Sequence, residues 1–246
     1  MEKAYKFRIY PDTNQKIMIS KTMSCNRYVY NYYLNKMKEF GYQNAFTNIM
    51  DYKSNLKYKD TFLQEVDSII IRQALFNLDN AFQKMFKEHS GYSRYKNKHS
   101  KCSYNTCAIY SKYKDKEYCN IEVDLNKRMI KLPKLKWLKI RGYRNLNKIV
   151  GKIKNATVER ESNGKYYVSV LYEQEDIKYK VIPKNVVWID LGIKKLLTLS
   201  DGTSYDNNKY ILKYEKRIKR KQRELSRKVK RSNNYYKCKK ELARLY

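Results

Sequence analysis

The sequence predicts an α+β protein: an antiparallel sheet or small β-barrel with helices inserted into it, followed by a shorter segment of strands and helices. Three observations predict this class. Apolar residues alternate with polar ones near the start and again between Tyr118 and Glu173, which is the period of half-buried strands. In between they recur every three or four residues, the period of amphipathic helices. A length of 246 residues with a hydrophobic fraction of 42% is enough to form a core.

The first strand is expected in "AYKFRIY", residues 4–10, where aromatic and aliphatic residues alternate with Lys6 and Arg8. A helix should follow from Asp12, because Gln15 lies three residues further on and completes a variant of the capping box. This helix is expected to run to about Phe40. Its apolar stripe consists of Met23, Tyr30, Leu34 and Met37.

A second helix is expected to begin near Asp67 and Ser68 and to end by Gly91. The segment before it, residues 41–59, is less regular and leaves room for a short helix after Thr47. Apolar residues recur at steps of four and three along this helix, so one face should pack against another helix. A basic, tyrosine-rich loop, "SRYKNKHSKCSYN", comes next. The apolar stripe of the second helix consists of Ile71, Leu75, Leu78, Phe82 and Met85.

The tyrosines have two interpretations. Those of the first helix, Tyr28, Tyr30, Tyr32 and Tyr33, are expected mainly in the core. Three others, Tyr92, Tyr95 and Tyr104, lie among lysines, and either core packing or stacking on nucleic-acid bases is open for them.

The strand-rich region contains two hairpin patterns, "NIEVDLNKRMIKLP" and "ATVERESNGKYYVSVLYE", with a further strand in "KWLKIRG". Asn163 and Gly164 form the strongest two-residue hairpin signal in the second pattern. The strand at residues 4–10 can join this sheet, which makes the helices an insertion. "DIKYKVIPKN" reads as a linker that ends near Pro183.

The last segment opens with "VVWIDLGIKKLLTLSDG". It predicts a strand over residues 186–190, a tight turn, a strand over residues 195–200 and a turn at Asp201 and Gly202. A third short strand, a helix, a turn at residues 232–234 and a return helix are expected next. Their apolar stripes consist of Ile211, Tyr214, Ile218, Leu225 and Val229, and of Cys238, Leu242 and Leu245.

The charge of the chain is strongly one-sided. It carries 55 Lys and Arg residues against 24 Asp and Glu residues, a formal net charge of +31. Such an excess attracts polyanions, so nucleic acid is the expected partner. An A/T-rich coding bias would enrich lysine, but it favours glutamate as well and does not explain the imbalance.

The sequence also indicates the cellular compartment in which the protein is expected. No stretch resembles a signal peptide and no apolar run is long enough to span a bilayer, so we expect a cytoplasmic protein without a membrane partner. Five scattered cysteines, an odd number, favour reduced thiols. They lack close Cys-x-x-Cys pairing, so no zinc site is expected in this chain.

Asp190 ends an apolar strand and precedes Leu191 and Gly192. One interpretation is a turn residue. The other is a metal-binding carboxylate, because RNase H-like nucleases begin with an acidic residue on a first strand that leads through a hairpin into a helix. Such sites hold two divalent ions bridged by carboxylates. A single aspartate cannot form one, so other carboxylates would have to complete it.

The helix after residue 210 is densely basic, with only Glu215 and Glu224 to offset its cations. A solvated helix face is the alternative interpretation, but surface helices of that kind mix charge signs. Like charges four residues apart destabilise a helix, which favours a bound polyanion. The residues expected to contact nucleic acid here are Lys216, Arg217, Arg220, Arg223, Arg227, Lys228, Lys230 and Arg231.

Taken together, the segments are similar in kind and order to those of the TnpB (OrfB) family of insertion-sequence proteins, which are RNA-guided DNA endonucleases. The resemblance rests on "KFRIYPDTNQ", "EVDSIIIRQALFNLDNAFQKMF", "IKLPKLKWLKI", "GKIKNATVERESNGKYYVSVL", "WIDLGIKKLLTLSDG" and "KQRELSRK". It implies a wedge-like β-barrel at residues 1–10 and 101–182 and a helical recognition lobe at residues 11–100. It also implies the N-terminal part of a RuvC nuclease domain of RNase H-like fold at residues 183–246.

The resemblance further implies site residues and partners. Asp190 falls on the first RuvC carboxylate, whose complete site binds Mg²⁺. Guide RNA and target DNA are the implied partners: the basic helices would grip RNA, and Arg72 and Gln73 would approach DNA. The second acidic residue, the zinc module and the last aspartate of the family have no counterpart here. The expectation is therefore a C-terminally truncated protein that is inactive alone.

Two other functions stay open on the sequence. One is a nuclease-inactive RNA- or DNA-binding regulator. The other is a basic ribosome-associated protein.

Overall fold

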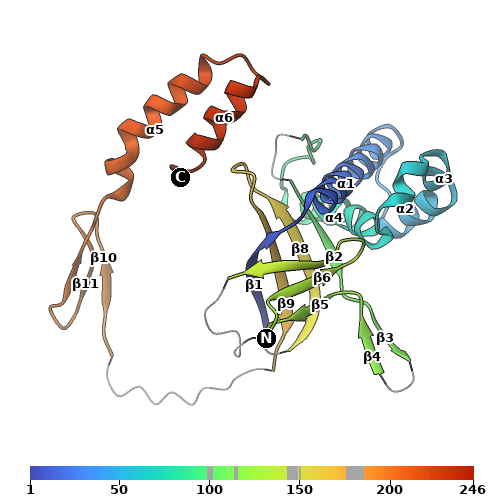
Figure 1. Cartoon of the computed structure of the whole chain (residues 1–246), viewed down its shortest axis with the longest axis horizontal. Coiled ribbons are helices and arrows are strands. Elements are labelled where there is room, and N and C mark those ends of the chain that lie inside the picture. The colour runs from blue at the N-terminus through green and yellow to red at the C-terminus, as the bar shows by residue number, and fades with distance from the viewer. Residues whose placement is uncertain (99–101, 114–115, 143–148, 150, 176–185) are drawn as a thin grey trace. The chain divides into compact units, whose positions relative to one another are not determined.

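A computed structural model describes residues 1–98, 102–113, 116–142, 149, 151–175 and 186–246. The chain divides into two compact units, residues 1–175 and residues 176–246 (Figure 1). The linker predicted at "DIKYKVIPKN", residues 176–185, lies outside the described residues. None of the helices in the described part of the chain is both long and apolar enough to cross a membrane.

The first unit is built on a seven-stranded antiparallel sheet with the order β2-β8-β9-β1-β7-β6-β5. The first strand of the chain lies near its middle: Phe7 pairs with Val168 on one side and Ile9 with Ile140 on the other. The strands are β1 (Glu2–Tyr10), β2 (Cys102–Cys107), β5 (Glu122–Asp124), β6 (Met129–Leu132), β7 (Lys136–Arg141), β8 (Lys152–Arg160) and β9 (Tyr166–Glu173).

This sheet corrects the prediction of a barrel. Strands β2 and β5 are its two edges, and no hydrogen-bonded pairing joins them among the described residues. The sheet is therefore open. Helices cover edge strand β2, because α4 (Ser68–Glu88) and α1 (Thr13–Phe40) both contact it. A separate hairpin, β3 (Tyr110–Tyr113) with β4 (Lys116–Cys119), extends from the sheet in Figure 1.

Helix α1 begins as the sequence predicts. The Asp12 side chain accepts from the Gln15 backbone N–H at 2.8 Å, and the Gln15 side chain accepts from the Asp12 N–H at 2.9 Å. Helix α4 is capped by Asp67, which accepts from the backbone N–H of Ile69. Between these helices the chain is more helical than predicted. It forms α2 (Ala45–Asp51), a π-helical turn (Tyr52–Leu56), α3 (Lys57–Lys59) and a 3₁₀ turn (Thr61–Glu65).

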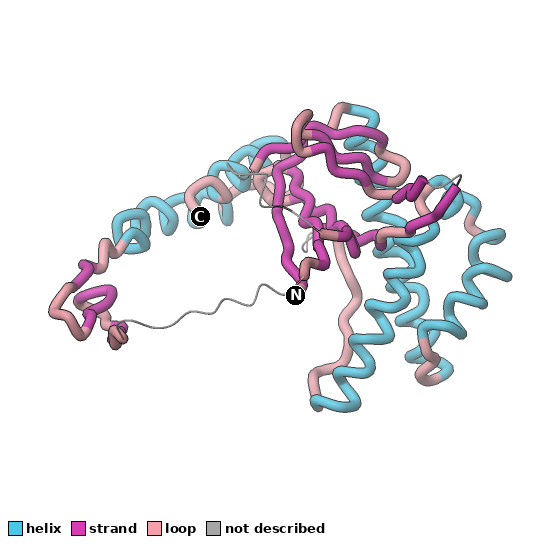
Figure 2. The backbone as a smooth tube through the Cα atoms, turned by 90° about the horizontal axis from the view of Figure 1, so that it is seen from below, coloured by secondary structure: helices cyan, strands magenta, loops and turns pink. Residues whose placement is uncertain are grey.

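Two hydrophobic cores hold the first unit together, and α1 contributes to both. Its first turns place Ile19 and Met23 against the sheet. Its later turns place Tyr33 and Leu34, both fully buried, against α4 and α2. In Figures 1 and 2 the helices α1–α4 gather on one side of the sheet. This shared helix fixes the helical part onto the sheet.

The second unit contains a three-stranded antiparallel sheet and a helical hairpin. The strands are β10 (Ile189–Leu191), β11 (Lys195–Leu199) and β12 (Ser204–Asp206), in that order. The helices are α5 (Tyr210–Ser226) and α6 (Asn233–Leu242). The strands, turns and helices predicted for this segment are present with different bounds. The first strand begins at Ile189 and not at residue 186, α6 ends before Leu245, and α5 ends earlier than its apolar stripe implied. Val229 lies in the turn and is exposed, so it takes no part in helix packing.

Candidate nucleic-acid interface

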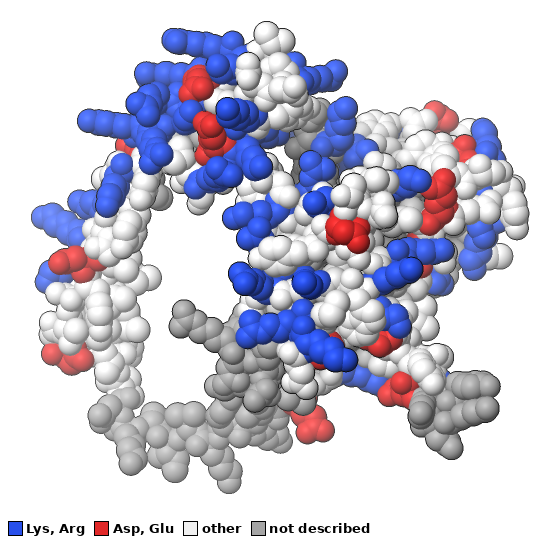
Figure 3. Space-filling view, in the orientation of Figure 1, with Lys and Arg blue, Asp and Glu red and all other residues white. Residues whose placement is uncertain are grey.

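The basic helix α5 and the turn after it carry all eight cations that the sequence singled out. Seven of them are exposed and Lys228 is half-buried. Lys, Arg, Glu and Gln lose little side-chain freedom in a helix, so this composition forms one in spite of its charge. Figure 3 shows lysine and arginine side chains gathered over these helices with few carboxylates between them. We call Arg220, Arg223, Arg227 and Lys228 the α5 basic face.

Carboxylates neutralise two of the lysines of α5. Lys219 pairs with Glu215 at 2.5 Å, and Lys221 pairs with Glu224 at 2.8 Å. In contrast, none of the arginines of α5 has a carboxylate within 4.0 Å in the described part of the chain. Their guanidinium groups are thus available to an external anion.

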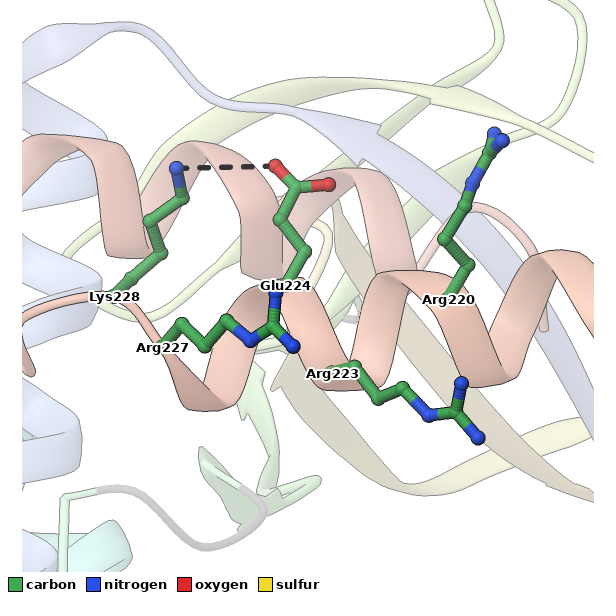
Figure 4. Close-up of a pocket in the computed structure, with 5 residues that line it drawn as sticks. All are labelled: Arg220, Arg223, Glu224, Arg227 and Lys228. Carbon is green, nitrogen blue, oxygen red and sulfur yellow. Dashed lines mark ion pairs between the residues drawn. The ribbon is translucent and has the colours of Figure 1, made fainter.

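The α5 basic face encloses a shallow hollow of about 540 Å³, lined by its four residues and Glu224. In Figure 4 Lys228 points to Glu224, at 4.0 Å, whereas Arg220 and Arg223 extend away from the helix. Arginines three, four and seven residues apart share one side of a helix. A guanidinium binds phosphate through two parallel N–H donors. This arrangement suits consecutive phosphates of a nucleic-acid backbone.

Helix α6 supports α5 from the other side. Lys221 also pairs with Glu241 of α6 at 2.7 Å. Hydrogen bonds to Glu224 and Glu241 raise the pKa of Lys221, and the bond from Lys221 lowers the pKa of Glu241. The buried Cys238 lies between the helices. Ser232 caps α6 by accepting from the Tyr235 N–H at 3.1 Å. Contacts between α5 and α6 therefore hold the α5 basic face in place.

Arg72 and Gln73 occupy a different place, on α4 in the first unit. Both are half-buried. The Gln73 Oε1 accepts from the Cys107 thiol of edge strand β2 at 3.2 Å. Burial raises the pKa of Cys107, and Arg72 partly opposes this rise. The structure thus sets these two residues beside β2, and the predicted nucleic-acid residues divide between the two units.

Asp190 lies on β10, exposed, opposite Thr198 of β11. The hairpin predicted after it is present. The same small sheet carries two other carboxylates: Asp206, on β12, and Asp201, in a turn where the Thr203 N–H donates to it at 2.8 Å and lowers its pKa.

The residues around Asp190 do not by themselves fit a divalent-metal centre. Among the residues that the structure describes, no group of three or more His, Cys, Asp or Glu side chains could hold a metal ion. Mg²⁺ requires near-octahedral oxygen ligation, and one exposed carboxylate on a strand supplies only part of it. No catalytic step can be derived from this carboxylate alone.

The three tyrosines for which core packing or base stacking was open, Tyr92, Tyr95 and Tyr104, differ in their burial. Tyr104 belongs to β2 and is buried in the sheet core. Tyr92 and Tyr95 stay about half exposed, and the Lys38 ammonium lies 5.6 and 4.1 Å from their ring centroids. Sequence reasoning missed Lys38, because a single lysine on α1 gives no sign of the loop that folds back over it.

Two OrfB family models match the chain. The one described as "Probable transposase" matches residues 169–246, and the one described as "Helix-turn-helix domain" matches residues 1–44. In the structure, the second range consists mainly of strand β1 and the single long helix α1.

Two curated relatives match over almost the whole chain. "Putative RNA-guided DNA endonuclease InsQ" of Escherichia coli (strain K12) is 31% identical over 252 residues, which cover 99% of this chain and 58% of the relative. "Putative RNA-guided DNA endonuclease" of Streptomyces pristinaespiralis is 32% identical over 254 residues, which cover 100% of this chain and 60% of the relative. The chain therefore spans about three fifths of the length of these relatives.

A solved structure was also found to be similar, the "Cryo-EM structure of the Cas12f1-sgRNA-target DNA complex". It is 14% identical, and the match covers 99% of this chain and 65% of that chain with a TM-score of 0.37.

Proposed function

This chain belongs to the TnpB (OrfB) family, and from that premise we propose that it supplies the guide-RNA- and target-DNA-binding part of an RNA-guided DNA endonuclease encoded by a transposable element. The observation that carries the proposal is the α5 basic face, whose arginines have no carboxylate partner among the described residues. Unneutralised arginines at helical spacing are what a phosphate backbone requires.

The proposed roles follow the order of the elements. Residues 1–10 and 101–182 act as the wedge domain, and residues 11–100 act as the recognition lobe. Residues 183–246 are the opening part of a RuvC-like nuclease domain. Support for the last role comes from β10 and the residues that flank it, where Trp188, Leu191 and Ile193 are 77%, 76% and 87% exposed. Apolar side chains at this density on a small sheet are typical of a surface that further structure covers.

The proposed residue roles differ in kind. The α5 basic face, with Lys216, Arg217, Lys230 and Arg231, binds the backbone of guide RNA. Arg72 and Gln73 contact target DNA, from their position beside edge strand β2. Asp190 is the first of three RuvC carboxylates, and a Mg²⁺ site there depends on carboxylates that the described residues do not provide. In such a complex base pairing reads the sequence, and the protein reads backbone shape.

The first test identifies the RNA. The chain is expressed together with the DNA that flanks its gene, and the RNA that copurifies with it is sequenced. One discrete RNA from that DNA is the expected result. Recovery of ribosomal RNA alone would instead identify a ribosome-associated protein and overturn the proposal.

The second test separates binding from cleavage. The chain, its RNA, a matching DNA target and Mg²⁺ are combined, with Asp190→Ala as the matched variant. We expect RNA and DNA binding that is equal in both proteins and no strand cleavage by either. Robust cleavage by the chain alone would refute the assignment of Asp190 to an incomplete site.

A non-enzymatic regulator is the second candidate. It is favoured by the finding that no group of three or more His, Cys, Asp or Glu side chains in the described part of the chain could hold a metal ion. It predicts that the chain occludes its DNA target in cells, as measured by repression of a reporter that carries the target. Under the nuclease proposal, repression should vanish when the RNA is withheld.

A further inference from the structure

The outward face of helix α1 carries a long groove that the proposed function does not use. Two adjoining hollows, each of about 480 Å³, share Lys21 and Ser24. One extends toward the start of the helix past Lys16 and Ser20, and the other toward Tyr28. These residues are spaced three or four apart, so they form a single stripe along the helix. Serine side chains leave the floor of the groove low.

Aromatic rings line the hollow near Tyr28. Tyr28 and Phe62, from the 3₁₀ turn, lie in an edge-to-face arrangement with ring centroids 5.5 Å apart. They are 39% and 44% exposed. The Tyr28 hydroxyl donates to Asp60 Oδ2 at 2.7 Å, and this bond raises the pKa of Tyr28 to about 12. The ring that contributes its edge to such a pair keeps its own faces clear of its partner, so a flat ligand can stack there.

Cations border the same groove. Lys21 is occupied by Glu65 at 2.6 Å. Lys16 and the half-buried Arg27 have no carboxylate within 4.0 Å in the described part of the chain. Arg27 instead donates to the Ser24 hydroxyl at 3.3 Å. A groove with an aromatic wall, hydroxyl donors and free cations matches a base and its flanking phosphates.

We propose that this α1 groove binds an unpaired nucleobase of a single-stranded nucleic acid. The base stacks on a free face of one ring of the Tyr28–Phe62 pair and meets the other ring at its edge, because the two rings are nearly perpendicular. Phosphates of the same strand contact Arg27 and, further along the helix, Lys16. Duplex nucleic acid does not fit this site, because its bases are stacked on one another and offer no free face. The inference rests on the proposed function only in that the chain binds nucleic acid, and it adds a site on the helical part of the first unit.

The test uses a fluorescent base and a matched pair of variants. The full chain is titrated into a short single-stranded oligonucleotide that carries 2-aminopurine, which is quenched when it stacks. Phe62→Leu removes one aromatic wall. Phe46→Leu is the control, because Phe46 on α2 is also exposed and also lies edge-to-face with a phenylalanine, Phe76, but outside the groove. Thermal unfolding of both variants verifies that they are folded.

We expect Phe62→Leu to weaken oligonucleotide binding about tenfold and to abolish the quench, while Phe46→Leu changes neither. Photo-crosslinking from a 5-bromouracil in the strand should map to the peptides that contain Tyr28 or Phe62. Equal losses in the two variants, or crosslinks confined to other helices, would overturn the site. Binding of a polyglutamate peptide that Phe62→Leu weakens, with no quench of 2-aminopurine in the strand, would identify an acidic peptide as the occupant instead.

Failure of this inference can be told apart from failure of the proposed function. Loss of binding on Arg223→Gln with no effect of Phe62→Leu would remove the α1 groove alone. Absence of binding to any nucleic acid would remove both.

Discussion

Lys221 of α5 and Glu241 of α6 are joined by a 2.7 Å ion pair that ties the helical hairpin of the second unit together. The pair turns one lysine inward to the second helix. The arginines beside it remain on the outer side of α5. The hairpin thus separates its cations into one that holds the fold and others that are available for binding.

Removing the acidic partner should loosen the hairpin. In Glu241→Gln, amide hydrogen exchange of α6 should accelerate about two- to fivefold at pH 7, because an exposed ion pair contributes modestly. The pKa of Glu241 is lowered in the folded chain. Its contribution is therefore present above its unfolded pKa of about 4.3 and is lost as the pH falls through the folded value. Glu215→Gln, which breaks a pair within α5 only, should leave α6 unchanged.

Removing the free arginines should change the salt dependence of RNA binding. For Arg223→Gln combined with Arg227→Gln, the slope of log affinity against log salt concentration should fall in magnitude by about two, one for each phosphate that the variant no longer neutralises. Lys219→Gln is the control, since Glu215 already neutralises that lysine. Filter binding between about 50 and 200 mM salt measures the slope for the arginine variant and for the lysine control. Identical slopes for the arginine and lysine variants would contradict the role of the α5 basic face.

The helical part of the first unit depends on one acidic residue. Asp51 accepts from the Tyr33 hydroxyl at 2.8 Å and from Asn55 at 2.9 Å, and it pairs with Lys36 at 2.9 Å. Burial alone would raise the pKa of Asp51, but these bonds outweigh it and the pKa is lowered. Asp51→Asn should therefore lower the free energy of unfolding by about 1–2 kcal/mol at pH 7.

The sign of the pH dependence follows from the lowered pKa. The stabilisation by Asp51 is complete above its unfolded pKa of about 3.9 and disappears as the pH falls through the folded value. Urea unfolding at pH 7 and at successively lower pH should show the full wild-type advantage at pH 7 and a shrinking advantage as the pH falls below about 3.9. An equal difference at every pH would show that the charge of Asp51 is unimportant.

Two glycines of the sheet should differ in their tolerance to a methyl group. Gly164, in the β8–β9 turn, has a φ of 82° with nothing within 4 Å of an added Cβ. Gly164→Ala should cost about 1 kcal/mol from the left-handed backbone alone. Gly151 has a φ of 120°, and an added Cβ would lie 2.2 Å from the Glu173 carbonyl oxygen. Gly151→Ala should cost about 3 kcal/mol or more. The urea concentrations at the unfolding midpoints of the two variants measure these costs. Equal shifts of the midpoint would contradict the clash at Gly151.

Local patterns in the sequence predicted those elements whose signals are local. The capping of α1 by Asp12 and Gln15 is a four-residue motif, and the structure confirms it. The same Gln15 also donates to the backbone oxygens of Leu135 and Trp137, at 2.8 and 3.1 Å. No pattern in the sequence could indicate these bonds, because they join residues more than a hundred positions apart.

The elements that were missed depend on distant partners. Strand β2 was predicted as a basic loop, because its residues between Cys102 and Cys107 include few aliphatic side chains. It is a strand because it pairs along its whole length with β8, from Cys102 opposite Arg160 to Cys107 opposite Asn155. The same distinction applies to the candidate binding sites, which could be predicted only where the signal is local in the sequence. The α5 basic face was readable from composition, whereas the α1 groove requires Phe62 to fold back onto Tyr28.

The central position of β1 has a consequence for synthesis. This strand is synthesised before the other described strands of its sheet, but its partner β9 is complete only after residue 173 has been made. At roughly 5–20 residues per second, the side of the nascent strand that pairs with β9 waits about ten to thirty seconds for its partner. Throughout that interval the unpaired edge and the apolar face of the strand are exposed, which favours aggregation.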